Sequence, residues 1–107
     1  MKRFGQIIKI EKEKEEYYIN LHKNVWIGVQ KKINECNIKN YSIFIRDGFL
    51  FAYFEYVGDD FEGDMQKMAD DPLTQEWWAE CKPCQEPVAS ANADEWWANM
   101  DNVFFQA

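Results

Sequence analysis

The one histidine of the chain, His22, lies four residues after Tyr18 and four residues before Trp26. Positions four apart in a helix differ by only about 40° around its axis, so a phenol, an imidazole and an indole would face the same space. Imidazole can both give and take a proton near neutral pH. The stripe therefore predicts a site for proton transfer, and its alternative is a hydrogen-bonded structural histidine on an aromatic face.

The composition limits what such a site can hold. The 107 residues are enough for one domain, spanning 1–107, and Phe, Trp and Tyr make up 17% of them. So many rings require either a large core or a cavity with aromatic walls. The formal net charge of −7 would repel nucleic-acid phosphates and anionic membrane surfaces. We therefore expect no nucleic acid and no membrane as partner, and a small neutral ligand.

Two further features indicate a cytoplasmic protein. The apolar residues of the segment 1–10 are interrupted by Gln6 and Lys9, so it does not resemble a signal peptide, and no apolar run approaches the roughly 18 residues of a membrane span. An odd number of cysteines suits reduced thiols better than a disulfide framework, and the chain has three: Cys36, Cys81 and Cys84.

Hydrophobic periodicity predicts the elements that position the stripe. Alternating apolar residues predict strands at 38–46 and 49–56, and the Asp47-Gly48 pair between them is a strong hairpin signal. Another strand is expected at 4–11. Between it and the hairpin, apolar residues at helical spacing predict a helix over 12–37 that carries the stripe.

Glycine at position 28, inside the long helix, costs roughly 1 kcal/mol of helix stability relative to alanine. Gly28 therefore indicates a bend or a close backbone approach nearby.

The second half of the chain is predicted to alternate between helices and irregular segments. Asp59-Asp60 can cap a helix that runs to about Ala69, and Asp71-Pro72 can begin another that contains Trp77 and Trp78. Residues 82–94 are expected to form an extended loop, of the kind that is usually functional or mobile.

A last strand, expected at 100–106, completes the order βα-ββ-α-β with one extra helix. This order is typical of the ferredoxin-like split βαβ arrangement, so the expected fold class is α+β with an antiparallel sheet. Helices on one face of such a sheet leave the other face bare, and a second copy or a ligand must cover it. We therefore expect a homodimer whose sheets face each other.

The tetrapeptide Glu-Trp-Trp-Ala occurs twice, at 76–79 and at 95–98. Indole rings offer a flat platform for the apolar face of a sugar and an N–H that donates a hydrogen bond. We expect Trp77 and Trp78 to form a ligand wall, because the extended loop follows them. For Trp96 and Trp97, packing and ligand contact stay equal alternatives.

Cys81-Lys82-Pro83-Cys84 has the spacing of a redox or metal motif but lacks its setting. A structural zinc needs four ligands, and the chain offers three cysteines and one histidine on different elements. A thioredoxin-type pair begins a helix, whereas this one follows a helix. We expect no metal and no cofactor. One proton-transfer group, several tyrosines and aromatic walls suit proton movement on a neutral, hydroxyl-rich ring.

Over nearly its whole length the chain resembles the L-rhamnose mutarotase family. The resemblance is carried by Glu16-Tyr17-Tyr18 with His22 and Val25-Trp26, by the segment 40–44, and by Asp71-Pro72 through Glu76-Trp77-Trp78. It implies a dimeric α/β barrel. It also implies an enzyme that interconverts the α and β anomers of L-rhamnose, or of a related deoxyhexose, by acid–base ring opening and closure.

The resemblance further implies a role for individual residues. The histidine that matches His22 is the proton donor, and the residues that match Tyr18, Tyr41, Trp77 and Trp78 bind the sugar. Trp26 is a candidate pocket wall. Two alternatives stay open: a sugar-binding module without catalysis, and another dimeric α/β-barrel enzyme, such as a haem-degrading or quinol monooxygenase.

Overall fold

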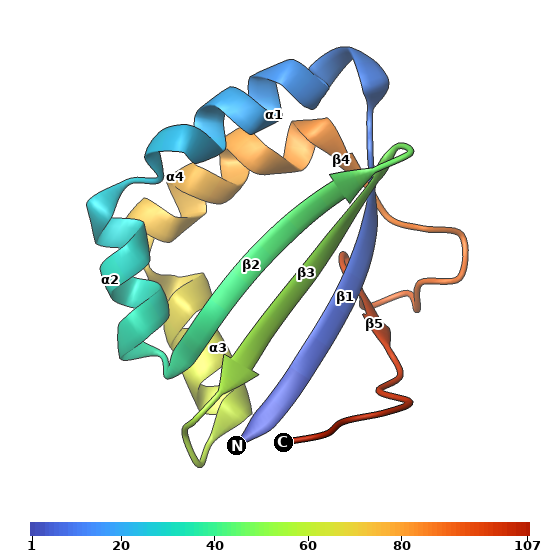
Figure 1. Ribbon diagram of the computed structural model, residues 1–107. Helices are drawn as coiled ribbons and strands as arrows, with labels where there is room; N and C mark the ends of the chain where they lie inside the picture. The colour runs from blue at the N-terminus through green and yellow to red at the C-terminus, as the bar shows by residue number, and fades with distance from the viewer.

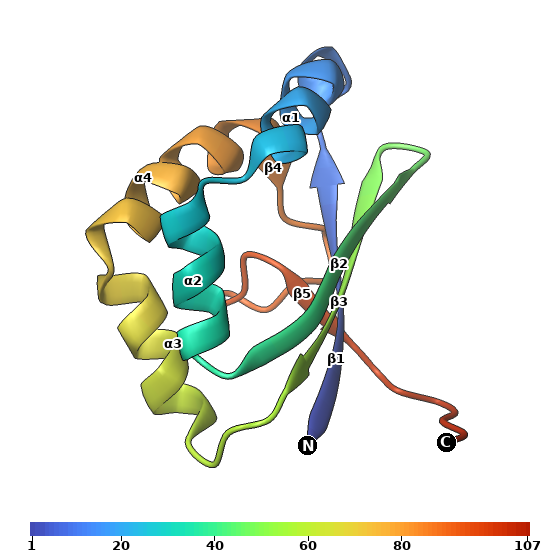
Figure 2. The ribbon, with the colours of Figure 1, turned by 60° about the vertical axis from the view of Figure 1, so that its left-hand side comes forward.

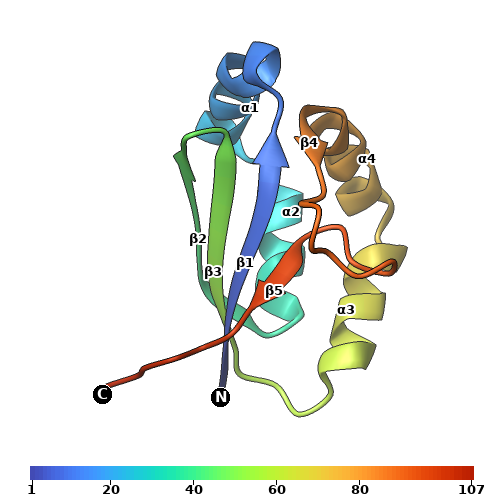
Figure 3. The ribbon, with the colours of Figure 1, turned by 90° about the vertical axis from the view of Figure 1, so that its right-hand side faces the viewer.

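Three long antiparallel strands form a curled sheet at the centre of the computed structural model, which describes residues 1–107 (Figure 1). β1 (Lys2–Ile10) lies between β3 (Phe49–Tyr56) and two short strands, and β2 (Ile38–Arg46) forms the outer edge. The short strands β4 (Gln85–Glu86) and β5 (Ala98–Met100) pair with different parts of β1 (Figure 3). This order confirms the predicted ferredoxin-like α+β fold.

The hairpin between β2 and β3 has the predicted position. Asp47 and Gly48 have φ values of 52° and 81°, so both lie in the left-handed region that a two-residue hairpin turn requires. The turn sets a register that pairs Ile45 with Leu50 and Ile43 with Ala52. Because side chains alternate along a strand, this register turns Tyr41, Ile43 and Ile45 toward the helices.

The predicted single helix over 12–37 is wrong, because the chain forms two helices there. A 3-10 turn leads into α1 (Glu15–Leu21), a second turn begins at His22, and α2 (Ile27–Glu35) starts after an extended Trp26 with ψ of 132°. The Gln30 side-chain amide donates to the Val25 carbonyl at 2.9 Å, which occupies a group that a continuous helix would use. The bend therefore lies just before Gly28.

Two more helices begin at the aspartates that the sequence indicates. α3 (Phe61–Asp70) is capped by Asp60, whose carboxylate accepts from the Gly63 N–H at 3.1 Å. α4 (Pro72–Cys81) is capped by Asp71, which accepts from the N–H and the hydroxyl of Thr74 at 3.0 and 2.7 Å. These caps satisfy N–H groups that the first turn of a helix leaves without partners.

All four helices cover one face of the sheet, and the opposite face carries none (Figure 2). Between the two layers lies a core of buried side chains that includes Ile8, Val29 and Leu50, each at most 2% exposed. On the bare face Phe44 stays 65% exposed. None of the helices is long and apolar enough to cross a membrane.

The end of the chain differs from the predicted strand at 100–106. β5 ends at Met100, and the following residues form no regular structure. Val103 and Phe104 are 93% and 77% exposed, so they pack against no other part of the chain. The expected loop at 82–94 also begins later, because a 3-10 turn at Lys82–Cys84 and the strand β4 occupy its first residues.

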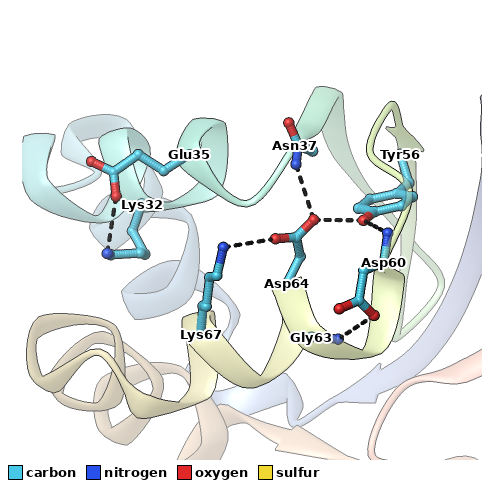
Figure 4. Close-up of polar contacts among 8 residues, drawn as sticks. All are labelled: Lys32, Glu35, Asn37, Tyr56, Asp60, Gly63, Asp64 and Lys67. Carbon is cyan, nitrogen blue, oxygen red and sulfur yellow. Dashed lines mark hydrogen bonds and ion pairs between the residues drawn. The ribbon is translucent and has the colours of Figure 1, made fainter.

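A polar cluster ties α3 to the sheet (Figure 4). Asp64 accepts hydrogen bonds from the Tyr56 hydroxyl at 2.5 Å and from the Asn37 amide at 2.9 Å, and it lies 3.5 Å from the Lys67 ammonium. The Tyr56 hydroxyl in turn accepts from the N–H of Asp60 at 2.9 Å. These hydrogen bonds lower the pKa of Asp64, with the Tyr56 bond as the largest cause. The cluster therefore fixes the start of α3 to the end of β3.

Candidate active site

A cavity of about 940 Å³ opens between the helices and the covered face of the sheet. Its size lies within the range of small-molecule sites, and most of its lining is apolar. The sequence-predicted residues that line it are Tyr18, His22, Tyr41, Trp77 and Trp78. The fold thus brings these five side chains from α1, β2 and α4 around one space.

His22 sits at the end of α1, between two aromatic rings. Its ring centroid lies 4.1 Å from that of Tyr18 in a stacked arrangement and 5.1 Å from that of Trp77 in an edge-on arrangement. Burial lowers the pKa of His22, and its hydrogen bond to the Tyr18 carbonyl opposes this only in part. The imidazole is therefore neutral at pH 7.

The hydrogen bond to the backbone also fixes the tautomer of His22. Nδ1 lies 2.8 Å from the Tyr18 carbonyl oxygen. A carbonyl can only accept, so Nδ1 carries the proton of the neutral ring and Nε2 carries the lone pair. Nε2 makes no hydrogen bond within the protein and is the nitrogen that is free to act on a ligand.

Two phenols, those of Tyr18 and Tyr41, belong to the lining. Tyr18 is 3% exposed, and burial is the largest cause that raises its pKa. Burial raises the pKa of Tyr41, another lining residue, to about 12, although 42% of the residue as a whole is exposed. Both phenols are therefore neutral hydrogen-bonding groups at pH 7.

The tryptophans form two layers. Trp78 lines the cavity, and so does Trp77, which is 6% exposed. Trp26, expected as a candidate wall, is not among the lining residues: its ring packs edge-on against Trp77 with centroids 5.2 Å apart. Trp26 therefore supports the wall from behind, because the break before α2 turns it away from the line of Tyr18 and His22.

Gln85 on β4 is a functional candidate that the sequence does not indicate, and it contacts Trp96, for which the sequence leaves packing and ligand contact as equal alternatives. The Gln85 amide nitrogen donates to the Tyr18 hydroxyl at 3.2 Å, and its amide oxygen accepts from the Trp96 indole N–H at 2.8 Å. Gln85 is 8% exposed, and both residues line the cavity. The spacing gave no sign of this contact, since 67 residues separate Tyr18 from Gln85.

The charged groups in the lining are two lysines, Lys23 and Lys82, and no carboxylate is present there. The Lys82 ammonium lies over the rings of Trp78 and Trp96, at 5.5 and 5.8 Å from their centroids. Hydrolysis of glycosidic bonds commonly uses a pair of carboxylates, so this lining does not supply that chemistry. His22 is the group in the lining suited to proton transfer near neutral pH.

The cysteine pair adds bulk rather than reactivity. Cys81 lines the cavity at 5% exposure, and burial raises the pKa of its thiol to about 12. Cys84 is 1% exposed and its pKa is also raised by burial. Both stay protonated at neutral pH, whereas a reactive cysteine needs its thiolate form.

Known proteins of similar sequence point to one family. A UPF0734 protein of Dictyostelium discoideum is 32% identical over 110 aligned residues, which cover 96% of this chain and 88% of that protein. The L-rhamnose mutarotase of Bacillus subtilis (strain 168) is 33% identical over 85 residues, 78% of this chain and 79% of the relative.

The fold has a counterpart among solved structures. The crystal structure of an L-rhamnose mutarotase from Formosa agariphila aligns over 100% of both chains with a TM-score of 0.78 and 21% sequence identity. At that identity the likeness concerns the fold, which is that of a dimeric α/β-barrel subunit. The family model described as L-rhamnose mutarotase matches residues 3–106, so the chain belongs to the L-rhamnose mutarotase family.

Proposed function

We propose that this protein is an aldose mutarotase that interconverts the α and β anomers of L-rhamnose or a related deoxyhexose. The observation that carries the proposal is the position of His22, which lines a cavity of sugar-binding size between Tyr18 and Trp77 and whose Nε2 has no partner within the protein. Family membership and the name of the Bacillus subtilis relative support the same activity.

The chemistry requires one proton to leave the anomeric hydroxyl and one to reach the ring oxygen. In our proposal the neutral His22 takes the anomeric proton on Nε2 while the bond between the anomeric carbon and the ring oxygen breaks. His22 then supplies that proton to the ring oxygen, which gives the open-chain aldehyde. After rotation about the adjacent carbon–carbon bond, the reverse transfers close the ring in the other anomer. Acid–base help of this kind contributes roughly 10² to 10⁴ in rate.

The remaining lining residues hold the sugar in this proposal. Tyr18 and Tyr41 are neutral phenols that hydrogen-bond sugar oxygens, and their raised pKa values keep them protonated. Trp77 and Trp78 contact the apolar face of the pyranose with their rings. Neither a metal nor a cofactor enters the reaction, because the bond changes involve only protons and one carbon–oxygen bond.

The test replaces His22 with alanine and follows anomer exchange of L-rhamnose and L-fucose by saturation-transfer NMR. We expect the enzyme-dependent exchange rate to fall by 10²-fold or more. Asn20→Ala, which changes an exposed residue of the same helix, is the matched control and keeps the wild-type rate. Wild-type exchange in a folded His22→Ala variant would refute the role of His22. Sugar binding by the wild-type protein without any faster exchange would select a binding module instead.

We further infer a homodimer in which two subunits cover each other's bare sheet faces. Phe44 on that face is 65% exposed, and Phe105 of the tail lies against the Arg3 guanidinium at 3.5 Å. An antiparallel sheet with an apolar outer face needs such a cover.

We also propose that the protein is one mutarotase domain over 1–107 and that it is located in the cytoplasm. Its three free cysteines suit a reducing compartment.

A further inference from the structure

A chain of hydrogen bonds links the segment after β4 to the cavity. The Trp96 indole N–H donates to the Gln85 amide oxygen at 2.8 Å, and the Gln85 amide nitrogen donates to the Tyr18 hydroxyl at 3.2 Å. We call these three residues the relay. Each of them lines the cavity, and Gln85 and Tyr18 are 8% and 3% exposed. The relay is therefore built into the wall of the proposed sugar site.

The direction of the relay follows from the chemistry of its first member. An indole N–H can only donate, so the amide of Gln85 must turn its oxygen toward Trp96. The amide nitrogen then faces Tyr18 and can only donate. The Tyr18 hydroxyl is consequently the acceptor in this contact, and its own proton is left for another acceptor. No protein group accepts that proton.

We propose that Gln85 is a positioning residue that, held by Trp96, makes Tyr18 a hydrogen-bond donor to an oxygen of the substrate. The proposal rests on the proposed mutarotase function and adds to it the direction of the Tyr18 contact and a role for Trp96. Trp96 acts here through its N–H rather than through its ring. Gln85 does not touch the reacting atoms and acts through Tyr18.

Gln85→Glu tests the direction with almost no change in shape. At neutral pH a carboxylate can only accept, so it draws the Tyr18 proton away from the sugar. We expect kcat/KM for anomer exchange to fall about tenfold, the worth of one hydrogen bond, mainly through a higher KM. When the pH is lowered, the buried glutamic acid becomes protonated and regains a donor. The ratio of variant to wild-type kcat/KM should therefore rise toward one in acid.

Two more variants separate the relay from packing. Trp96→Phe keeps an aromatic ring, although a smaller one, and removes the donor, and Gln85→Leu removes the whole amide; we expect each to lower kcat/KM by about tenfold without the recovery in acid. Gln75→Leu is the matched control, because Gln75 is an exposed amide on α4 that lies outside the cavity lining. It should keep the wild-type kinetics.

A readout that needs no activity monitors the relay itself. The Trp96 indole N–H, assigned through Trp96→Phe, should shift upfield in the ¹H–¹⁵N spectrum of Gln85→Leu, because it loses its acceptor. Unchanged kinetics in Gln85→Glu, or a tenfold loss that does not recover in acid, would overturn the proposal. So would an unshifted indole resonance in Gln85→Leu. A wild-type protein that exchanges no sugar, with the indole shift as expected, would instead overturn the proposed function and with it the substrate contact of Tyr18.

Discussion

One hydrogen bond decides which nitrogen of His22 acts on a ligand. The Tyr18 carbonyl holds Nδ1 at 2.8 Å, which leaves Nε2 with the lone pair. A histidine that starts as a neutral base differs in its pH behaviour from one that starts as an acid, since only the first needs the unprotonated ring. The role of His22 can therefore be read from a pH profile.

We predict that the enzyme-dependent rate is constant around neutral pH and falls in acid. Burial lowers the pKa of His22 below its ordinary value of 6.5, so the active neutral ring is lost only when the pH drops through that lowered pKa. Anomer exchange, measured from pH 4.5 to 8 with the buffer-catalysed background subtracted, tests this. A rate that rises as the solution becomes more acidic would mean that the imidazolium begins the reaction, and would contradict the proposed order of transfers.

At the residue scale, the sequence predicts which residues line the site better than it predicts the contacts between them. Tyr18, His22, Tyr41, Trp77 and Trp78 were named from spacing and family resemblance, and the fold brings them around one cavity. The hydrogen bond from Gln85 to Tyr18, and the one from Trp96 to Gln85, could not be predicted, because the position of Gln85 depends on how β4 pairs with β1. No local pattern encodes a pairing between segments so far apart in the chain.

A glycine lets the helices α2 and α4 approach each other closely. Gly28 of α2 lies so close to α4 that an added Cβ would sit 2.3 Å from Cδ2 of Leu73. Glycine costs roughly 1 kcal/mol relative to alanine inside a helix, so this position gives up local stability for a close approach. The approach sets the distance between the helix that follows His22 and the helix that carries Trp77.

We predict that Gly28→Ala lowers the free energy of unfolding by about 1–3 kcal/mol, because overpacking outweighs the better helix propensity. Urea unfolding followed by circular dichroism measures the change. In a Leu73→Ala background the same substitution should be neutral or stabilising, since the methyl group that it meets is gone. A stabilised Gly28→Ala single variant would contradict the close approach.

Element boundaries were predictable where a local rule fixes them. The hairpin at Asp47-Gly48 and the caps at Asp60 and Asp71 occupy the expected positions, because each depends on a few adjacent residues. Gly28 indicates a bend or a close approach nearby, but the sequence does not predict that the chain divides into two helices at Trp26. Apolar periodicity continues through it, and the interruption comes from the Gln30 side chain and from the packing of Trp26 on Trp77.

The whole molecule has one covered and one uncovered sheet face, and the proposed dimer joins the uncovered ones (Figure 2). We predict that Phe44→Asp shifts the protein from dimer to monomer in sedimentation velocity, because the substitution would bury a charge in the interface. Ile27→Asp is the matched control: Ile27 is 71% exposed but lies on α2, on the helical side, so this variant should stay dimeric. A dimeric Phe44→Asp protein would contradict the interface.

The arrangement of the tryptophans has a practical consequence. The chain has five of them. Four line the cavity, namely Trp77, Trp78, Trp96 and Trp97, and Trp26 packs behind Trp77 with ring centroids 5.2 Å apart. The intrinsic fluorescence of the protein therefore originates almost entirely at the proposed sugar site. Entry of an unlabelled sugar displaces water from these indoles, so its affinity can be titrated from the emission spectrum alone.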